Sequence, residues 1–486
     1  MDLCLTLAEV SPRILEEKIA RYVDQVPYIE VRLDYLEKPQ IPALPGDCQT
    51  QFIGTCRPVR EGGRFESEEK ARLKLLQDAA HSGFVWIDLE HDVWPIPDFP
   101  STTRTLRSFH CFDGFTDDLA SQFQNLHTGR GDAVKLAVSV TRTEELVRLL
   151  RWMETLSNEI PFVILGMNDL GQPSRFLSAF LGNQWTYVAE DGMERVAPGQ
   201  FTLQEAREVY LLDQCGEGTQ IYGIIGNPVV HSLSPAIHNH LFRHYELNKV
   251  YLPLLLDDAH VWMKYVGESI LPFRGLSVTL PFKEDVLKFV KGEGISLPAL
   301  NTLIRTASGW EGINTDHAGF LKTLKSSVSL QGKRVIVLGN GGVAHTVVKA
   351  LQDEGAEVIV IGRNAQRVSK FAGLYGCSHL LFSDLPVAGD ICVNTTPVGQ
   401  YPNDEESPLQ EDHLNFGVVY DLIYHPKETR LLKMARARDL RTISGIEMFV
   451  EQAALQFAAW TGISPDRELM KEIVSQEFMR IGTNWR

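Results

Sequence analysis

Eight short runs of β-forming residues divide the first 215 residues, and helix-like stretches separate most of them. The runs cover residues 3–8, 28–33, 51–56, 84–89, 104–109, 133–140, 162–167 and 185–189. One of the stretches repeats apolar side chains at the i, i+3, i+4 and i+7 spacing of one helix face, namely Leu146, Leu149, Leu150 and Met153. Strands that alternate with helices form parallel sheets, because each parallel neighbour needs a long crossover. Eight such units in little more than 200 residues predict a (β/α)8 TIM barrel over residues 1–215.

A glycine-rich loop lies far behind this region, in the stretch VLGNGGVAHTVVKAL at 337–351. Gly339, Gly341 and Ala344 match G-x-G-x-x-G/A between a strand-like run at 334–338 and an amphipathic stretch, and a second strand-like run follows at 357–362. Glycine lets the backbone approach a pyrophosphate, and a helix N-terminus faces the anion. In this context the loop predicts a dinucleotide site rather than a plain glycine-rich turn.

The end of the second run indicates which dinucleotide. An NAD enzyme usually carries Asp or Glu there, whereas this chain reads Gly362, Arg363, Asn364. Arg363 can pair with a 2′-phosphate, which favours NADP(H). The alternative is that Arg363 is a solvated charge at the end of a strand.

The length of 486 residues exceeds one ordinary core, so several domains are expected. A helical pattern ends in a glycine-containing segment at 211–220, and we place a boundary there. We expect a barrel over 1–215, alternating strands and helices over 220–325, a Rossmann-type NADP domain over 326–445 and C-terminal helices over 446–486.

Composition excludes several classes of protein. The net charge of −15 argues against a nucleic-acid partner, because there is no basic surplus to release counterions. The seven cysteines are scattered without a C-x-x-C pair, which predicts free thiols rather than a zinc site or a disulfide frame. No apolar run approaches the ~20 residues of a membrane span, and the N-terminus lacks a basic or Arg/Ser-rich leader. The sequence therefore predicts a cytoplasmic enzyme without a metal.

Hydroxyl and amide side chains gather in the segments 222–242, 276–286 and 298–320. Such residues suit a polyol ligand, since each buried hydroxyl needs a partner. Lys283 and Asp316 together suit the transfer of one proton to or from a carbinol. Taken singly, Lys283 is more simply a solvated helix start and Asp316 a helix cap.

Together these segments closely resemble shikimate dehydrogenase. The motifs GNPVVHSLSPAIHN, VTLPFK, NTD, the glycine-rich loop, VNTTPVG, YDLIYHP and GIEMFVEQA follow the family's order over 221–486. The resemblance implies a two-lobed α/β dehydrogenase, whose substrate lobe over 220–325 is completed by the helices over 446–486. It also implies that Lys283 and Asp316 are the catalytic pair of an NADPH-dependent reduction of 3-dehydroshikimate to shikimate. The residues it implies for the substrate are Ser232, Ser234, Thr279, Asn301, Tyr424 and Gln452. Those it implies for the cofactor are Gly339, Asn340, Gly341, Gly342, Val343, Ala344 and Arg363, with Thr395, Leu422, Gly445 and Met448 beside the nicotinamide.

Two positions depart from that pattern. Ser277 stands where many bacterial members carry Asn, so one substrate contact is expected to be weaker or changed. Gly362 and Asn364 flank Arg363 where N-R-T is common, which leaves the phosphate site with one clear cation. A quinate-using, NAD-dependent dehydrogenase is therefore an alternative.

Polar residues also gather near the C-terminal ends of the predicted barrel strands, where TIM barrels keep their active sites. We place Glu30 and Arg32 on the second strand, Arg57 after the third, Asp88 and Glu90 on the fourth, and His110 after the fifth. Lys135 lies inside the apolar run AVKLAV and must be paired or neutral there. Nearby arginines would lower its pKa and leave a free amine, the nucleophile of a Schiff base. The alternative is a structural ion pair with Glu90 or Asp88, and His110 alone is typical of an ordinary loop or core histidine.

Residues 1–215 resemble type I 3-dehydroquinate dehydratase through EVRLDY, TCRPVREGG, IDLE, SFHCFDG, VKLAV, SRF and APGQ. The resemblance implies that Lys135 forms an imine with the C3 ketone of 3-dehydroquinate. His110 then removes a C2 proton and helps the C1 hydroxyl to leave, with Glu61 tuning the imidazole. The residues implied to hold the substrate are Glu30, Arg32, Arg57, Arg175 and Gln200. Val196 stands where members carry Ser, so one contact is expected to be missing, and the short barrel is expected to have trimmed loops or no N-terminal hairpin.

The two resemblances together imply a bifunctional enzyme for consecutive steps of the shikimate pathway. A ligand-sensing regulator without turnover is the rival from another class. It predicts decayed catalytic positions, yet Lys135, His110, Lys283 and Asp316 are all present. Channelling of the intermediate between the halves is a hypothesis only.

Overall fold

The computed structural model describes the chain except for residues 129–130, 158, 193–198, 230–231, 292–298 and 485–486. It forms two compact units. The first consists of residues 1–295 with 305–311, and the second of residues 296–304 with 312–486. None of the described helices is long and apolar enough to cross a membrane.

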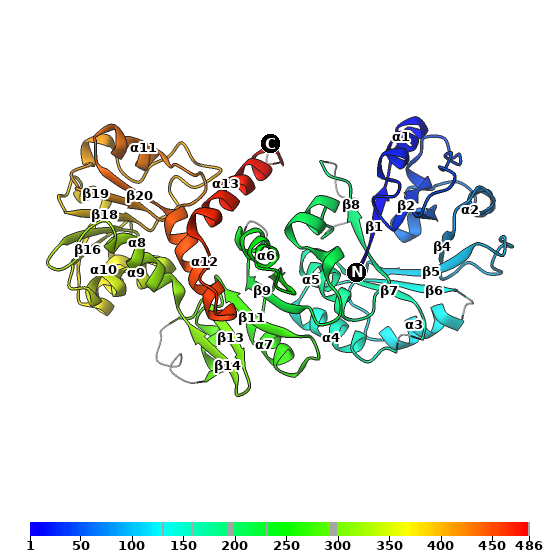
Figure 1. Cartoon of the computed structure of the whole chain (residues 1–486), viewed down its shortest axis with the longest axis horizontal. Coiled ribbons are helices and arrows are strands. Elements are labelled where there is room, and N and C mark those ends of the chain that lie inside the picture. Colours follow the sequence, from blue (N-terminus) through cyan, green and yellow to red (C-terminus); the bar gives the residue numbers. More distant parts are fainter. Residues whose placement is uncertain (129–130, 158, 193–198, 230–231, 292–298, 485–486) are drawn as a thin grey trace. The chain divides into compact units, whose positions relative to one another are not determined.

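Eight parallel strands in the first unit form the predicted TIM barrel (Figure 1). They are β1 (Asp2–Leu7), β2 (Tyr28–Arg32), β3 (Gln51–Thr55), β4 (Trp86–Glu90), β5 (Arg104–Cys111), β6 (Ala133–Ser139), β7 (Phe162–Met167) and β8 (Trp185–Ala189). The ladder runs in the order β7-β6-β5-β4-β3-β2-β1-β8, and a hydrogen bond from Gln184 N to Phe162 O of 3.0 Å links the β7 and β8 ends.

Five α-helices connect consecutive strands, as the sequence predicts for most of them, whereas the β2–β3 and β4–β5 connections contain no α-helix. The helices are α1 (Pro12–Tyr22), α2 (Glu69–His81), α3 (Leu119–Thr128), α4 (Thr143–Met153) and α5 (Gln172–Leu177). The predicted face of α4 is buried, and it consists of Leu146, Leu149, Leu150 and Met153. One prediction was wrong: His110 lies within β5, not after it. The ladder with β6 continues through the pairs His110–Ala137 and Cys111–Val138, which lengthens the strand by two residues.

The barrel interior changes from apolar to polar toward the C-terminal ends of the strands. Alternate side chains of a strand share one face, so the inward positions of β4 are Trp86, Asp88 and Glu90, and those of β5 are Leu106, Ser108 and His110. Trp86 and Leu106 belong to one apolar cluster, with Val163 and Trp185. The polar layer of the barrel interior packs directly against this apolar cluster.

The substrate lobe follows in the same unit. Its strands and helices are β9 (Gln220–Gly226), α6 (Ser234–His244), β10 (Lys249–Leu255), α7 (Ala259–Glu268) and β11 (Phe273–Val278), and β9 pairs in parallel with both β10 and β11. The strands β12 (Val290–Lys291), β13 (Thr302–Thr306) and β14 (Gly309–Ile313) follow along the chain.

Polar contacts join this lobe to the barrel. Thr143 N donates to Asp257 Oδ1 at 2.7 Å, and Thr143 Oγ1 accepts from Asp257 N at 2.9 Å. Glu154 Oε1 accepts from Tyr265 Oη at 2.9 Å. Asn239 Nδ2 donates to Val209 O, at the end of the barrel's short helix Glu205–Val209, at 2.7 Å, and Asn239 is fully buried. The barrel and the lobe are therefore joined by side-chain hydrogen bonds, one of them buried, and not by the chain alone.

The second unit carries a six-stranded parallel sheet in the order β17-β16-β15-β18-β19-β20. The strands are β15 (Arg334–Leu338), β16 (Glu357–Gly362), β17 (Ser378–Leu381), β18 (Ile391–Asn394), β19 (Val418–Asp421) and β20 (Arg441–Ser444). This is the 3-2-1-4-5-6 order of a Rossmann fold, whose ligand crevice opens where the order reverses, at the ends of β15 and β18.

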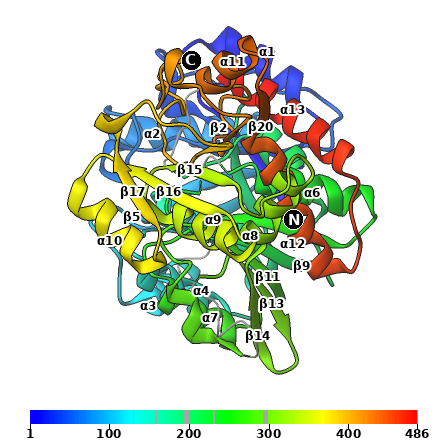
Figure 2. The ribbon, with the colours of Figure 1, turned by 90° about the vertical axis from the view of Figure 1, so that its left-hand side faces the viewer.

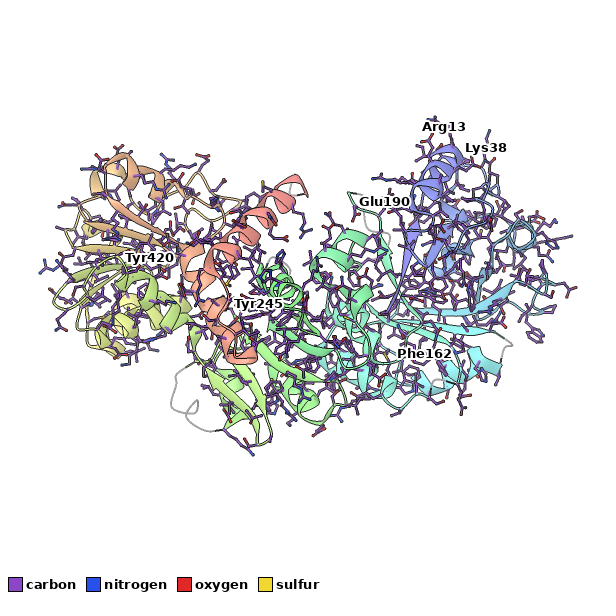
Figure 3. All side chains as sticks on the ribbon, viewed as in Figure 1. Arg13, Lys38, Phe162, Glu190, Tyr245 and Tyr420 are labelled. Atoms are coloured by element: carbon purple, nitrogen blue, oxygen red, sulfur yellow. The ribbon has the colours of Figure 1, made fainter. Side chains whose placement is uncertain are left out.

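Three helices cover one face of the sheet, namely α8 (Thr315–Lys325), α9 (Gly342–Asp353) and α10 (Ala365–Tyr375) (Figure 2). The other face packs against α11 (Arg430–Ala437), and α12 (Gly445–Thr461) and α13 (Arg467–Asn484) end the chain. Tyr420 of β19 lies on the α8 face, with its ring stacked on Phe320 at 5.3 Å between centroids (Figure 3).

Candidate active sites

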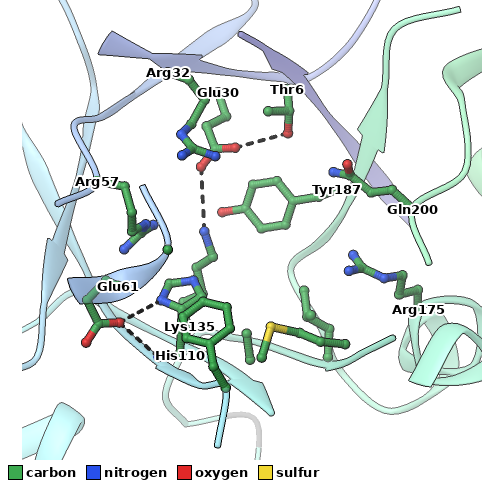
Figure 4. A pocket seen from close by; sticks show the side chains of 15 residues that line it. Thr6, Glu30, Arg32, Arg57, Glu61, His110, Lys135, Arg175, Tyr187 and Gln200 are labelled. Carbon is green, nitrogen blue, oxygen red and sulfur yellow. Dashed lines mark hydrogen bonds and ion pairs between the residues drawn. The ribbon is translucent and has the colours of Figure 1, made fainter. Parts of the chain in front are cut away.

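A cavity of about 240 Å³ lies at the C-terminal ends of the barrel strands (Figure 4). It is lined by Thr6, Glu30, Arg32, Arg57, Glu61, Gly62, His110, Phe112, Lys135, Ala137, Leu165, Met167, Arg175, Tyr187 and Gln200. All eight barrel residues predicted to act in catalysis or to hold the substrate are among them. Val196 lies outside the described residues.

Lys135 reaches this cavity from the middle of β6. Its Nζ lies 3.0 Å from Asp88 Oδ2 and 3.5 Å from Glu30 Oε1. It also lies 4.3 Å from the centroid of the Tyr187 ring. The side chain is 7% exposed, so its partners are carboxylates inside the barrel and not water. The predicted ion pair with Asp88 is present, whereas Glu90 pairs with arginines instead.

A network of buried charges lies beneath Lys135. Arg57 bonds to Asp88 at 2.6 Å and to Glu90 at 3.1 Å, and Arg72 of α2 reaches Glu90 from the other side at 2.6 Å. Burial raises the pKa of Asp88, but the charges of Arg57 and Lys135 outweigh it and hold that pKa well below its usual range. Asp88 therefore stays ionised, and it is a counter-ion for Lys135 rather than a base.

His110 and Glu61 form the second element of the cavity. His110 Nδ1 lies 3.1 Å from Glu61 Oε2, and His110 N donates to the same oxygen at 3.2 Å (Figure 4). Burial, with the charges of Arg57 and Lys135, holds the pKa of His110 well below its usual value. Burial raises the pKa of Glu61 to about 7. His110 is thus a neutral imidazole at pH 7, the form that a general base requires.

Arginine and amide side chains line the far side of the cavity. Figure 4 shows Arg175 and Gln200 across from Arg57 and Glu61. Arg175 is 2% exposed, and burial lowers its pKa to about 10, so it keeps its charge at pH 7. A buried guanidinium at the wall of a cavity suits a carboxylate ligand. Arg32 is held in place by a two-fold hydrogen bond to Asp34 at 2.9 and 2.8 Å.

The glycine-rich loop of the second unit turns β15 into α9. Gly339 has φ of 103°, and a Cβ there would lie 2.8 Å from Thr395 Oγ1, so the position requires glycine. A Cβ at Gly341 would meet nothing within 4 Å, so this backbone is open to a ligand. The residues present therefore fit a pyrophosphate at the start of α9.

A cavity of about 730 Å³ begins at this loop. Of the predicted cofactor residues, those that line it are Gly339, Asn340, Gly341, Arg363 and Thr395. Those that do not are Gly342, Val343, Ala344, Leu422, Gly445 and Met448, and Ala344 is instead part of the apolar core. Arg367 also lines the cavity, four residues after Arg363. Two cations therefore lie at the cavity wall where the 2′-phosphate is predicted to bind, and the sequence indicated only one of them.

Two loops beside the cavity are tied together by Asp421, at the end of β19. The Asp421 carboxylate accepts from Asn394 Nδ2 at 3.0 Å, from Thr429 Oγ1 at 2.6 Å and from Ile423 N at 3.1 Å. Asn394 in turn accepts from Thr396 N at 3.0 Å. Burial raises the pKa of Asp421 to about 6. Asp421 thereby fixes the segments that carry Thr395 and Leu422.

The residues predicted to hold shikimate and the predicted catalytic pair are divided between the two units. The substrate residues Ser232, Ser234 and Thr279 and the catalytic Lys283 belong to the first unit, and the substrate residues Asn301, Tyr424 and Gln452 and the catalytic Asp316 belong to the second. Their roles stay a prediction. In the first unit, Tyr251 Oη donates to Ser277 Oγ at 2.6 Å, so the departure at Ser277 places a tyrosine hydroxyl beside the shorter side chain.

The simpler alternatives for the predicted catalytic pair have different outcomes. Lys283 lies on the turn that leads into a short 3-10 helix (Asp285–Phe289), directly before its N-cap Glu284. Asp316 does not cap α8. Asn314 is the cap, and its side chain accepts from Asp316 N and His317 N. In the second unit, Asn301 Oδ1 accepts from Thr315 N at 2.8 Å, which orients its amide.

Comparison with known proteins agrees with this arrangement. Residues 3–217 match the family model of type I 3-dehydroquinase, and residues 224–303 match the substrate binding domain of shikimate dehydrogenase. Residues 322–394 match shikimate/quinate 5-dehydrogenase, and residues 445–474 match the C-terminal domain of shikimate 5′-dehydrogenase.

Similar proteins include a relative that carries both activities in its name. The chloroplastic bifunctional 3-dehydroquinate dehydratase/shikimate dehydrogenase of Arabidopsis thaliana is 31% identical over 486 residues, which cover 92% of this chain and 80% of that protein. The chain belongs to this bifunctional family. The shikimate dehydrogenase (NADP(+)) of Carboxydothermus hydrogenoformans is 37% identical over 270 residues, covering 53% of this chain and 96% of that one. A solved dehydroquinate dehydratase and shikimate dehydrogenase from S. pombe covers 97% of this chain and 98% of its own, at 22% identity and a TM-score of 0.45.

The sequence analysis did not name three residues that lie at or beside the two cavities. Arg72 lies on a helix whose sequence looks solvent-exposed, yet its side chain is fully buried under Glu90. Arg367 lies in the first turn of α10, four residues after Arg363, which precedes the helix, and the start of that predicted helix just after Arg363 could have revealed it. His91 follows the motif IDLE directly and lies against Glu61, and the sequence had no signal for that contact.

Proposed function

We propose that the barrel dehydrates 3-dehydroquinate through an imine on Lys135 and that the dehydrogenase half reduces the product, 3-dehydroshikimate, to shikimate with NADPH. The observation that carries the first part is the placement of the Lys135 amine. It lies inside a small cavity between an ionised carboxylate and a neutral imidazole. The family names of the matched regions and relatives support both parts.

The chemistry of the barrel follows from the charges around the amine. The Lys135 ammonium gives up one proton, its free amine adds to the C3 ketone, and one water is lost. The imine nitrogen then takes back that proton, which gives a protonated imine. Asp88 at 3.0 Å balances that positive charge. A protonated imine draws electrons from C2, so neutral His110 can remove a C2 proton with the ring nitrogen that Glu61 does not engage.

Elimination returns the same proton. His110 gives it to the C1 hydroxyl, which leaves as water, and the C1–C2 double bond forms. A water molecule then hydrolyses the imine and frees Lys135. One water enters and two leave, so the net reaction releases one water and no proton. Arg175 and Gln200 hold the carboxylate and hydroxyls of the ring during these steps.

In the dehydrogenase half, bound NADPH supplies the hydride that reaches the ketone carbon. The start of α9 with Gly339 and Gly341 would hold its pyrophosphate, and Arg363 with Arg367 would hold its 2′-phosphate. Lys283 and Asp316 supply the proton to the new hydroxyl. We also propose the division into domains at 1–215, 220–325 with 446–486, and 326–445. Because all seven cysteines are free thiols, we propose a reducing compartment, the cytoplasm.

Borohydride trapping tests the barrel chemistry. Incubation with 3-dehydroquinate and reduction should leave an adduct on Lys135, located by peptide mass spectrometry, and Lys135→Ala should leave none. An adduct on another lysine, or none with turnover intact, would contradict the imine assignment. Adenosine 2′,5′-bisphosphate tests the phosphate site without turnover. It should bind the native chain by calorimetry, and equal affinity for an analogue without the 2′-phosphate would refute the role of the two arginines.

A further inference from the structure

An aromatic side chain lies against the His110–Glu61 pair at the wall of the barrel cavity. Phe112 follows β5 directly and lines this cavity, yet 51% of the residue is exposed. Its ring lies nearly parallel to the His110 imidazole, at 13° and with 6.0 Å between ring centroids. The side chains of His110 and Glu61 are only 11% and 7% exposed. Phe112 thus presents one side to solvent and the other to this buried pair.

Gly62 brings the ring up to the Glu61 side of the pair. A Cβ at Gly62 would lie 2.6 Å from Phe112 Cζ, closer than any side chain allows. Gly62 also has φ of 72° and ends the short helix Val59–Glu61, which carries Glu61. Glycine here therefore both turns the chain and leaves room for the tip of the ring. The ring reaches from the imidazole on β5 to the backbone beside Glu61.

The backbone on both sides of Phe112 is anchored. The ladder between β5 and β6 continues up to the pair Cys111–Val138, directly before Phe112. Cys111 Sγ donates to Gly114 O at 3.3 Å, which closes the turn that follows. The place of the ring is therefore set by the end of the strand, so a substitution of the side chain leaves the backbone contacts intact.

Burial of the pair sets the protonation states that the proposed reaction uses. It is the largest cause both of the lowered pKa of His110 and of the raised pKa of Glu61. The charged and titratable groups that face His110 are Glu61, Arg57, Lys135, Asp88 and Arg32, and those that face Glu61 are His110, His91, Arg57, Glu90 and Asp92. Replacement of Phe112 keeps all of these charges in place, so it changes burial alone.

We propose that Phe112 is a positioning residue of the dehydratase, whose ring keeps water away from the contact between His110 and Glu61. The proposal rests on the proposed imine reaction, in which neutral His110 takes the C2 proton. Without the ring, water reaches both groups and solvates their charged forms. The pKa of His110 then rises and that of Glu61 falls, and an ionised Glu61 raises the pKa of His110 further. Both changes convert the base to imidazolium, which cannot accept a proton.

The experiment compares the full-length native chain with Phe112→Ala and Phe112→Leu. In Phe112→Ala we expect the pKa of His110 to rise to the ordinary value of about 6.5 or above. One pH unit below that value, only about one imidazole in ten is neutral. The kcat/KM for 3-dehydroquinate should therefore fall about tenfold relative to the native chain at about pH 5.5, and far less at about pH 8. Leu keeps an apolar cover and should leave the pH profile close to the native one.

An NMR titration of the imidazole gives the same pKa without turnover. In the full chain with isotope-labelled histidine, the signal of His110 is the one that His110→Gln removes, and its titration should move upward in Phe112→Ala. Phe115→Ala is the matched control. Phe115 lies three residues further along the same loop, is half-buried, packs against Arg148 at 5.0 Å and is not among the residues that line the cavity. This control should titrate like the native chain.

Three results would overturn the proposal. They are an unchanged pKa of His110 in Phe112→Ala, an equal shift in Phe112→Leu, and a loss of kcat/KM in Phe112→Ala that is the same at every pH. Absence of both the Lys135 adduct and turnover in the native chain would instead refute the proposed function. The NMR titration can still be read in that case, so the two failures are distinguishable.

Discussion

Asp421 makes the stability of the second unit depend on pH in a way that one substitution should remove. Burial raises its pKa from 3.8 to about 6. The folded chain therefore binds a proton more tightly at this site than the unfolded chain does. The stabilisation is fully present below the unfolded pKa and is lost as the pH rises through about 6. The difference of about two pKa units corresponds to about 3 kcal/mol in all, of which about 2 kcal/mol falls between pH 4.5 and pH 8.

Asp421→Asn should abolish this dependence. The amide oxygen can still accept from Asn394 and Ile423, and its nitrogen can donate to Thr429, so the loops stay tied without a buried charge. Relative to the native chain, the variant should gain about 2 kcal/mol between pH 4.5 and pH 8. For a unit of this size that is a shift in Tm of about 4–8 °C.

Scanning calorimetry of the full chain measures this shift. The transition that moves upward when NADP+ is added is assigned to the second unit. Asp390→Asn is the control, since the hydrogen bond from Lys333 lowers the pKa of that exposed carboxylate. Its stabilisation is present above the unfolded pKa and is lost as the pH falls, so its effect on the slope has the opposite sign. Equal pH slopes for the native chain and Asp421→Asn would refute the reasoning.

Three further outcomes are expected. Arg72→Met leaves Glu90 with Arg57 as its remaining cation, and the loss of one partner of a buried ion pair should cost about 3–5 kcal/mol in the free energy of unfolding, measured in urea by dehydratase activity. Thr143→Val removes the acceptor for the N–H of Asp257 and should lower the free energy of unfolding by roughly 1–3 kcal/mol. The midpoint of heat inactivation should fall for both activities. A lower midpoint for the dehydratase alone would contradict the view that the barrel and the substrate lobe form one compact unit. Arg367→Ser removes one charged partner of the 2′-phosphate and should lower the ratio of kcat/KM for NADPH over NADH about 10-fold to 100-fold, with an unchanged ratio as the refuting result.

The parts that sequence reasoning predicted depend on local backbone geometry. The run at 334–338 is β15 to the residue, and the loop after it needs glycine at 339 because φ is positive there. The buried face of α4 and the eight barrel strands were predicted from the local spacing of apolar residues, which can be read without knowing the tertiary contacts. Strand ends did not follow in the same way. His110 lies in β5 because the pairing with β6 extends past the apolar run, and pairing is a property of two strands.

The pairing of the buried charges beneath Lys135 could not be predicted from the sequence, because it depends on contacts between residues far apart in the chain. Nothing local distinguishes Arg72 from an exposed arginine on an amphipathic helix. It is buried because its partner is Glu90, eighteen positions further along the chain, whose side chain is itself fully buried. The sequence analysis therefore treated the charged partners of Lys135 as alternatives, Glu90 or Asp88. The three-dimensional structure assigns them by distance: Asp88 to Lys135, and Glu90 to the two arginines.

The dehydratase and dehydrogenase halves need different tests because their predicted residues are distributed differently between the two compact units. Every residue assigned to the dehydration lies in the first unit, so its geometry is complete within one compact body and its variants can be read without NADPH. The residues assigned to the reduction come from both units, with Lys283 in the first and Asp316 in the second. A variant at either residue is expected to lower shikimate turnover. Binding of the nucleotide alone is a separate readout, because Arg363 and Arg367 both belong to the second unit. A loss of shikimate turnover with intact nucleotide binding assigns the defect to the predicted catalytic or substrate residues.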